Sequence, residues 1–147
     1  MFYGPDLKDR AANMINKNLI TFSQLEFGGG AMASLGDIGF IYVPTACANG
    51  SVACALHLNF HGCLMGAYML GQTYVKHTGL NRWAENNNII VVYPQAAAAL
   101  LKENPEGCFD WWGYNDAKYA TQEGTQMKVM KKIIDRISGM SSSSSAS

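Results

Sequence analysis

The residues best suited to chemistry lie together where an apolar stretch ends at His61, Gly62 and Cys63. A strand that leads into a His-Gly pair is typical of loops whose backbone N–H groups stabilise the negative oxygen of a tetrahedral intermediate. Glycine suits such a loop because its backbone turns sharply and approaches a substrate closely. The segment therefore predicts stabilisation of an oxyanion, which is one half of the chemistry of acyl transfer.

The other half needs a nucleophilic serine in a G-x-S-x-G turn between a strand and a helix, with a histidine and a carboxylate. The nearest match is residues 32–36, but Met32 replaces the first glycine and no apolar strand precedes it. Of the three histidines, His61 is expected to hydrogen-bond its own loop and His57 to be a satisfied core residue, while no serine turn is predicted beside His77. We therefore expect no catalytic triad within this chain.

An even number of cysteines allows two disulfides in three connectivities. A zinc site with His57 and His61 is an alternative, although the chain has no C-x-x-C pair. Buried free thiols are a third interpretation. Disulfides are favoured and indicate an exported protein, although no basic or strongly apolar leader follows Met1. The four cysteines are Cys47, Cys54, Cys63 and Cys108.

The composition excludes several classes of protein. The chain has 147 residues, of which 48% are hydrophobic and 15% charged, so it has enough apolar surface to fold. Its 11 basic and 11 acidic residues cancel, and no basic run is present, so nucleic acid is not an expected partner. No apolar run approaches the roughly 20 residues of a membrane span, so no membrane partner is expected either.

Three strands are predicted from the apolar pattern. Residues 38–43 form the first, and a turn with the hairpin-type pair Asn49-Gly50 leads to the second at 55–60. Residues 89–93 are a continuous β-branched run, as in a strand buried on both faces of a parallel sheet. A crossover between the second and third strands would place both in one parallel sheet.

Helices are predicted at residues 7–20, 80–86 and 120–138, and residues 68–78 form either a helix or a partly ordered loop. Asn81 is the expected cap of the second helix, with Trp83 and Ala84 facing inward. The third helix has an apolar stripe that we assign to core packing. Its members are Met127, Met130, Ile133, Ile134 and Ile137.

The order of these elements predicts an α/β fold, as a piece of a sheet with about three strands and flanking helices. The expected organisation has three parts. Residues 1–37 are irregular, residues 38–139 form the α/β part, and residues 140–147 are a disordered serine-rich tail.

Four linked segments, in order along the chain, resemble the extracellular poly(3-hydroxybutyrate) depolymerases whose α/β-hydrolase fold is circularly permuted. They are LHLNFHGC at 56–63, TGLNRWA at 78–84, VYPQA at 92–96 and NPEGCFDWWGY at 104–114. In that family the serine, the acid and the histidine come first and the oxyanion segment last. The resemblance therefore implies that this chain is the C-terminal part of an extracellular serine-dependent ester hydrolase. It also implies a partial α/β-hydrolase-type sheet that lacks the half with the nucleophile turn.

The resemblance also implies roles for individual residues. The backbone N–H of Cys63 would donate to the oxyanion, and Cys63 and Cys108 would be bridged. Trp111 and Trp112 would lie along the groove for a polyester or short-chain ester, although a buried aromatic anchor is an equal alternative. No metal or cofactor is implied. Three hypotheses follow: an inactive C-terminal fragment, a binding module that has lost its nucleophile, or a chain completed by a separate N-terminal half.

Overall fold

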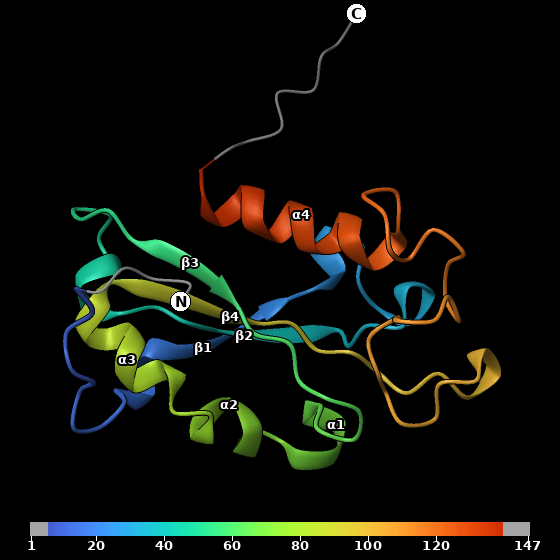
Figure 1. Cartoon of the computed structure of the whole chain (residues 1–147), viewed down its shortest axis with the longest axis horizontal. Coiled ribbons are helices and arrows are strands. Elements are labelled where there is room, and N and C mark those ends of the chain that lie inside the picture. Colours follow the sequence, from blue (N-terminus) through green and yellow to red (C-terminus); the bar gives the residue numbers. More distant parts are fainter. Residues whose placement is uncertain (1–5, 140–147) are drawn as a thin grey trace, which may run out of the picture.

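A four-stranded mixed sheet forms the centre of the computed structural model, which describes residues 6–139 (Figure 1). The strand order is β1-β2-β4-β3, with antiparallel pairing of β1 with β2 and of β2 with β4. Only the β3–β4 pair is parallel among the described strands. The strands are β1 (Leu19–Ser23), β2 (Ile38–Tyr42), β3 (Ala55–Leu58) and β4 (Ile89–Tyr93).

Strand β4 organises both hydrophobic cores because its apolar side chains alternate between the two faces of the sheet. Val92 belongs to one core, whereas Val91 and Tyr93 belong to the other. All three side chains are 2% exposed or less, which explains why the sequence here is continuously apolar.

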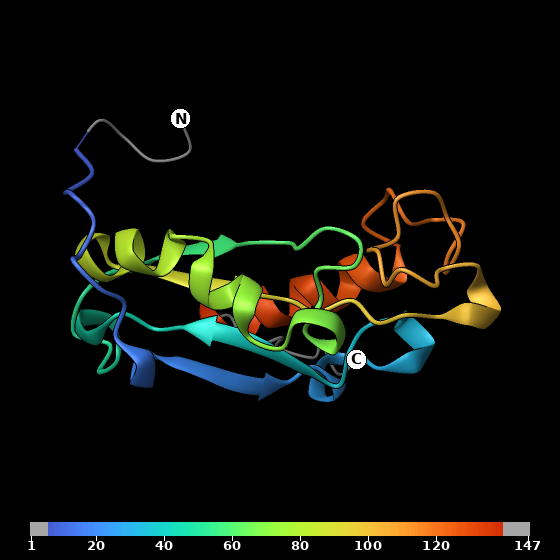
Figure 2. The same cartoon turned by 90° about the horizontal axis from the view of Figure 1, so that it is seen from below.

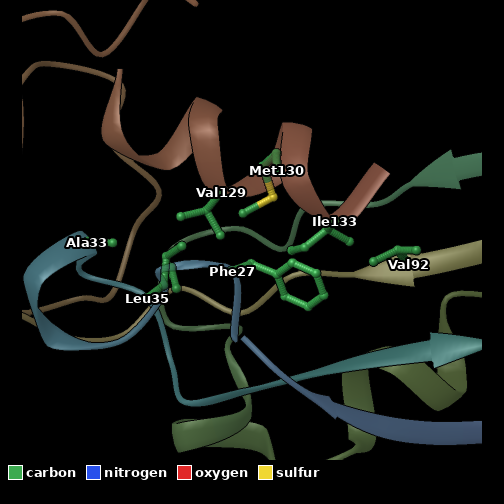
Figure 3. Close-up of a cluster of buried hydrophobic side chains, with 8 residues drawn as sticks. Phe27, Ala33, Leu35, Val92, Val129, Met130 and Ile133 are labelled. Atoms are coloured by element: carbon green, nitrogen blue, oxygen red, sulfur yellow. The ribbon is translucent and has the colours of Figure 1, made fainter. Parts of the chain in front are cut away.

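One long helix covers one face of the sheet and three short helices cover the other (Figures 1 and 2). Helix α4 (Thr125–Ile137) packs Val129, Met130 and Ile133 against the first core, where the labelled side chains of Figure 3 interlock. The opposite core receives Val75 and Ala84. The three short helices are α1 (Ala67–Leu70), α2 (Thr73–His77) and α3 (Leu80–Asn87).

The structure confirms the α/β class, the three predicted strands and the parallel pairing of the second with the third. The Asn49-Gly50 pair does lie in a turn, but it does not make a hairpin, because β4 is inserted between β2 and β3. A turn sequence fixes local direction only. The burial of β4 between two neighbours decides the strand order.

The predicted helix over residues 7–20 is wrong. A single 3-10 turn, Asn16–Asn18, leads directly into β1, so the segment expected to be irregular contains the fourth strand. Thr21 and Phe22 suit a strand, and each pairs with a residue of β2. The predicted serine-rich tail lies outside the described residues.

Two details of the helices also differ from expectation. Gly79, not Asn81, precedes α3, and the buried Asn81 side chain donates to the carbonyl of Val75 and accepts from the Tyr93 hydroxyl. Trp83 is 38% exposed, whereas Ala84 is buried as predicted. In α4, Met130 and Ile133 are buried as predicted, but Met127 is 49% exposed. No described helix has the length and apolarity that crossing a membrane requires.

Candidate functional site

Two loops meet at one edge of the sheet because β3 and β4 run parallel and end side by side. The first loop, residues 59–66, contains the His-Gly-Cys segment. The second loop, residues 94–124, contains the aromatic segment. A disulfide between Cys63 and Cys108 joins the two loops, and a second disulfide joins Cys47 to Cys54. The pairing that the resemblance implied is therefore present.

His61 ties the first loop to the end of β4. Its imidazole Nε2 accepts the backbone N–H of Ala96 at 3.1 Å, so the proton of the neutral ring lies on Nδ1, which donates to the carbonyl of Gly62 at 2.7 Å. The ring is only 4% exposed, and this burial lowers its pKa. Both ring nitrogens are occupied by backbone groups, so the predicted structural role is confirmed and His61 has no nitrogen free to act as a base.

The Gly62–Cys63 peptide group is held on one side only. The Gly62 carbonyl accepts a second hydrogen bond, from the backbone N–H of Met65 at 3.1 Å. By contrast, within residues 6–139 the N–H of Cys63 donates to no protein acceptor. Leu64, the next residue, has its N–H bonded to the carbonyl of Glu106 at 2.8 Å. The loop thus presents one unused backbone donor, and such a donor can bind an anion.

Two buried glutamines fix the start of the second loop. Gln24 accepts the N–H of Gln95 through Oε1 and donates to the carbonyls of Gly36 and Gln95 through Nε2. The Gln95 side chain accepts the N–H of Ala67 and donates to two carbonyls of its own segment. Sequence reasoning missed both residues, although a polar residue directly after a buried strand is a signal for Gln95.

The aromatic segment is folded around one carboxylate. The two oxygens of Asp110 accept backbone N–H groups from four successive residues, at distances from 2.6 to 3.1 Å. These donors are Gly113, Tyr114, Asn115 and Asp116. Sequence reasoning missed this role as well. The signal was an aspartate with a glycine three residues later, which is typical of a turn closed by the side chain.

Trp111 and Trp112 form an exposed aromatic surface on this segment. Trp111 is 69% exposed and Trp112 is 39% exposed, so the alternative of a buried anchor is wrong for Trp111. The two ring centroids are 5.1 Å apart in an edge-on arrangement, and Trp112 also contacts Tyr114 at 4.7 Å. Flat apolar faces are therefore available to a ligand.

Ser34 does not lie in a turn between a strand and a helix, which agrees with the rejection of residues 32–36 as a nucleophile turn. It is 1% exposed, follows the 3-10 turn Ala31–Ala33 instead of a strand, and donates its hydroxyl to Asn115 Oδ1 at 3.0 Å. Its hydroxyl is therefore buried and bonded to an amide oxygen instead of to a base that could activate it for attack.

The zinc interpretation and the free-thiol interpretation are wrong because all four cysteines are in disulfides. Ligand-type atoms of Cys63, Cys108 and Glu106 do lie within 4.8 Å of one another. Two of these atoms are the sulfurs of one disulfide, and a metal needs thiolates. The geometry therefore offers no zinc site at this cluster.

Comparisons with known proteins agree on one family. The chain is 42% identical over 129 residues to a poly(3-hydroxybutyrate) depolymerase of Delftia acidovorans, covering 86% of this chain and 25% of the relative. It is 32% identical over 151 residues to a polyhydroxybutyrate depolymerase of Talaromyces funiculosus, covering 93% of this chain and 43% of the relative. This chain thus spans less than half the length of the curated relatives. No protein-family profile matches the sequence.

Solved structures give the same result. A PHB depolymerase from Penicillium funiculosum matches with a TM-score of 0.80 and 29% identity, over 91% of this chain and 45% of that chain. A serine-to-alanine variant of a PHB depolymerase complexed with an R3HB trimer matches with a TM-score of 0.80 and 29% identity, over 92% of this chain. The mixed sheet and its helices therefore reproduce a part of the fold of those enzymes.

The two disulfides differ in how much of the chain they constrain. Cys63–Cys108 spans 45 residues and Cys47–Cys54 spans 7. Replacing Cys63 and Cys108 by serine should lower the free energy of unfolding by about 4 kcal/mol, and replacing the other pair by about 2 kcal/mol, because a longer closed loop restricts the unfolded chain more. Denaturant titration of both double variants measures the difference. Equal losses of unfolding free energy would show that the Cys63–Cys108 disulfide restricts the unfolded chain no more than the Cys47–Cys54 disulfide does.

The neutral state of His61 predicts a pH dependence of stability. Its pKa is lower in the folded chain, so the unfolded chain binds more protons below about pH 6.5. The stability gained from neutral His61 is complete above that pH and is lost as pH falls toward the folded pKa. Denaturant titrations at pH 7.5 and pH 5.5 should show a larger decrease for the parent than for His61→Gln. The exposed control His77→Gln should keep the parental decrease, and parental behaviour of His61→Gln would contradict the assignment.

Proposed function

Because this chain is homologous to part of the poly(3-hydroxybutyrate) depolymerases, we propose that it is the C-terminal part of a carboxylic ester hydrolase. In this proposal it supplies an oxyanion donor and an aromatic wall for a polyester or short-chain ester. The nucleophile, the histidine and the acid of the triad belong to a further segment. The observation that carries the proposal is the unused N–H of Cys63, in the loop that follows β3, where a disulfide joins it to the aromatic loop.

The Cys63 N–H fits an oxyanion because it is a fixed donor without a protein partner. Cys63 is held through its disulfide to Cys108, and the next N–H, of Leu64, is already bonded to Glu106. A donor fixed before the reaction needs no reorganisation when charge develops on the substrate oxygen, and one such donor contributes about 100- to 1000-fold in kcat.

The aromatic wall fits an apolar polyester. Trp111 and Trp112 offer exposed rings, and further large apolar side chains are exposed on the neighbouring loop and on α1. These additional side chains are Phe60, Leu64, Met65, Tyr68, Met69 and Leu70, each 39% exposed or more. Exposed apolar side chains on two loops that a disulfide joins suit a ligand of alternating hydrocarbon and ester groups.

The missing triad is assigned to a segment that pairs with β3. Strand β3 lies at the edge of the sheet, and β4 is its one partner among the described strands. An edge strand is the usual place for a further strand to join a sheet. Two disulfides fit an oxidising compartment, so we place the enzyme outside the cell.

The test is complementation. The chain is co-expressed with the N-terminal part of one of its depolymerase relatives, and hydrolysis of p-nitrophenyl butyrate is measured against each part alone. We expect turnover only with both parts. A complex that contains both folded parts and still shows no turnover would refute the hydrolase proposal.

A backbone variant then tests the oxyanion donor directly. Semisynthesis replaces the Gly62–Cys63 amide by an ester, which removes the N–H and leaves the side chain and its disulfide in place. We expect kcat to fall about 100- to 1000-fold in the complemented enzyme. The same replacement at the Leu64 N–H, which bonds the protein itself, is the matched control and should affect kcat much less.

A second candidate function, polymer binding without hydrolysis, is favoured by the exposure of Trp111 together with the burial of Ser34. The chain should bind films of poly(3-hydroxybutyrate), and the Trp111→Ala, Trp112→Ala double variant should lose most of that binding because the flat contact area is gone. Trp83→Ala, which removes a 38% exposed tryptophan from α3, is the control and should bind normally. Equal binding by all three proteins would refute the aromatic wall.

A further inference from the structure

We propose that His61 is a positioning residue, whose imidazole fixes the direction of the Cys63 N–H by holding the carbonyl of the same peptide group. The inference rests on the proposed oxyanion role of Cys63 and adds the residue that sets the direction of its N–H. His61 itself does not touch the substrate.

The argument starts from the planarity of the peptide group. In a trans peptide the C=O and the following N–H point in opposite directions within one plane, and no cis bond occurs in the described part of the chain. The Gly62 carbonyl accepts the His61 Nδ1–H at 2.7 Å and the Met65 N–H at 3.1 Å. These two bonds hold the carbonyl toward the protein, so the Cys63 N–H is directed away from it.

The imidazole can do this because it is itself fixed. Its Nε2 accepts the N–H of Ala96 at 3.1 Å, which sets the tautomer and ties the ring to the segment after β4. The Phe109 ring packs against it with centroids 5.0 Å apart. At Gly66, an added Cβ would lie 3.0 Å from the ring, so the backbone also closes tightly on it. The direction of the Cys63 N–H is therefore fixed relative to β4, through the ring and Ala96.

Two substitutions separate the two hydrogen bonds of the ring. In His61→Asn, the side-chain amide reaches the place of Nδ1 and can still donate to Gly62, but it cannot reach Ala96. In His61→Gln, the longer amide reaches the place of Nε2 and can still accept from Ala96, but it leaves the Gly62 carbonyl without its ring donor. Each variant loses one hydrogen bond of the 4% exposed residue, so we expect both to lose stability. Only in the glutamine variant should the direction of the Cys63 N–H change.

The direct readout is the orientation of the Cys63 N–H bond, measured by residual dipolar couplings in the weakly aligned, ¹⁵N-labelled full chain. We expect the coupling of Cys63 to be parental in His61→Asn and changed in His61→Gln, while couplings in β4 stay parental in both. A parental coupling in folded His61→Gln would overturn the proposal. This readout needs no activity, so it is independent of the proposed hydrolase function.

Kinetics of the complemented enzyme provide the second readout. His61→Gln should lower kcat for p-nitrophenyl butyrate about 100-fold with little change in KM, because a misdirected donor weakens stabilisation of the transition state. His61→Asn should retain most of kcat. Equal kcat losses in both variants would indicate a structural role only and would overturn the proposal. If the parent complex has no activity, the hydrolase proposal fails while the couplings still decide the role of His61.

The parent chain alone provides a test if neither variant folds. Imidazole ¹⁵N shifts should show the proton on Nδ1, and a coupling across the hydrogen bond should connect the Ala96 nitrogen to Nε2. A proton on Nε2 would leave Nδ1 unable to donate to Gly62, and that result would overturn the proposal.

Discussion

The parallel pairing of β3 with β4 is the constraint on which the site depends. Leu56 is paired with Ile90 and Leu58 with Val92, so both strands end at the same edge of the sheet. The loops that follow are far apart in sequence, yet they begin side by side. Without this register, neither the Cys63–Cys108 disulfide nor the bond from Ala96 to His61 could form.

Burial of polar groups converts that proximity into fixed geometry. Every buried side-chain nitrogen or oxygen in the described residues has a hydrogen-bond partner. Gln24, Gln95 and Asn104 are each 3% exposed or less, and they all bond backbone groups that a loop would otherwise leave unpaired. An unpaired buried amide is costly, so each of these side chains favours one path of the chain over its alternatives.

The parts of the fold that follow from hydrophobic pattern were predictable, and the parts that follow from pairing partners were not. The β-branched run at 89–93 identifies a buried strand because only its own composition is needed. The placement of β1 depends on partners 15 to 23 residues further along the chain, as in the pairing of Leu19 with Tyr42 and of Ser23 with Ile38. Asn81 was predicted to cap a helix because its residue type suits a cap. Its side chain instead accepts from the buried Tyr93 hydroxyl and donates to the Val75 carbonyl.

The candidate site likewise has parts that could be predicted from the sequence and parts that could not. The His-Gly-Cys segment was recognisable because an apolar strand leads directly into a His-Gly pair, and the resemblance to known enzymes added the disulfide. The carboxylate that folds the aromatic loop was not recognised, since Asp110 acts through four backbone N–H groups that only the folded loop brings together. Local turn chemistry can be anticipated from sequence, whereas the convergence of several donors on one group requires the path of the chain.

The proposed division, with an oxyanion donor on this chain and the nucleophile on another segment, is physically coherent because the two functions make different demands. A donor must be rigid before the reaction starts, since its benefit comes from avoided reorganisation. This chain meets that demand with its own disulfide, sheet edge and neutral histidine. A nucleophile and its base must instead exchange a proton at a reachable serine. Ser34 is buried and both nitrogens of His61 are occupied, so the proposed function assigns proton transfer to groups on another segment.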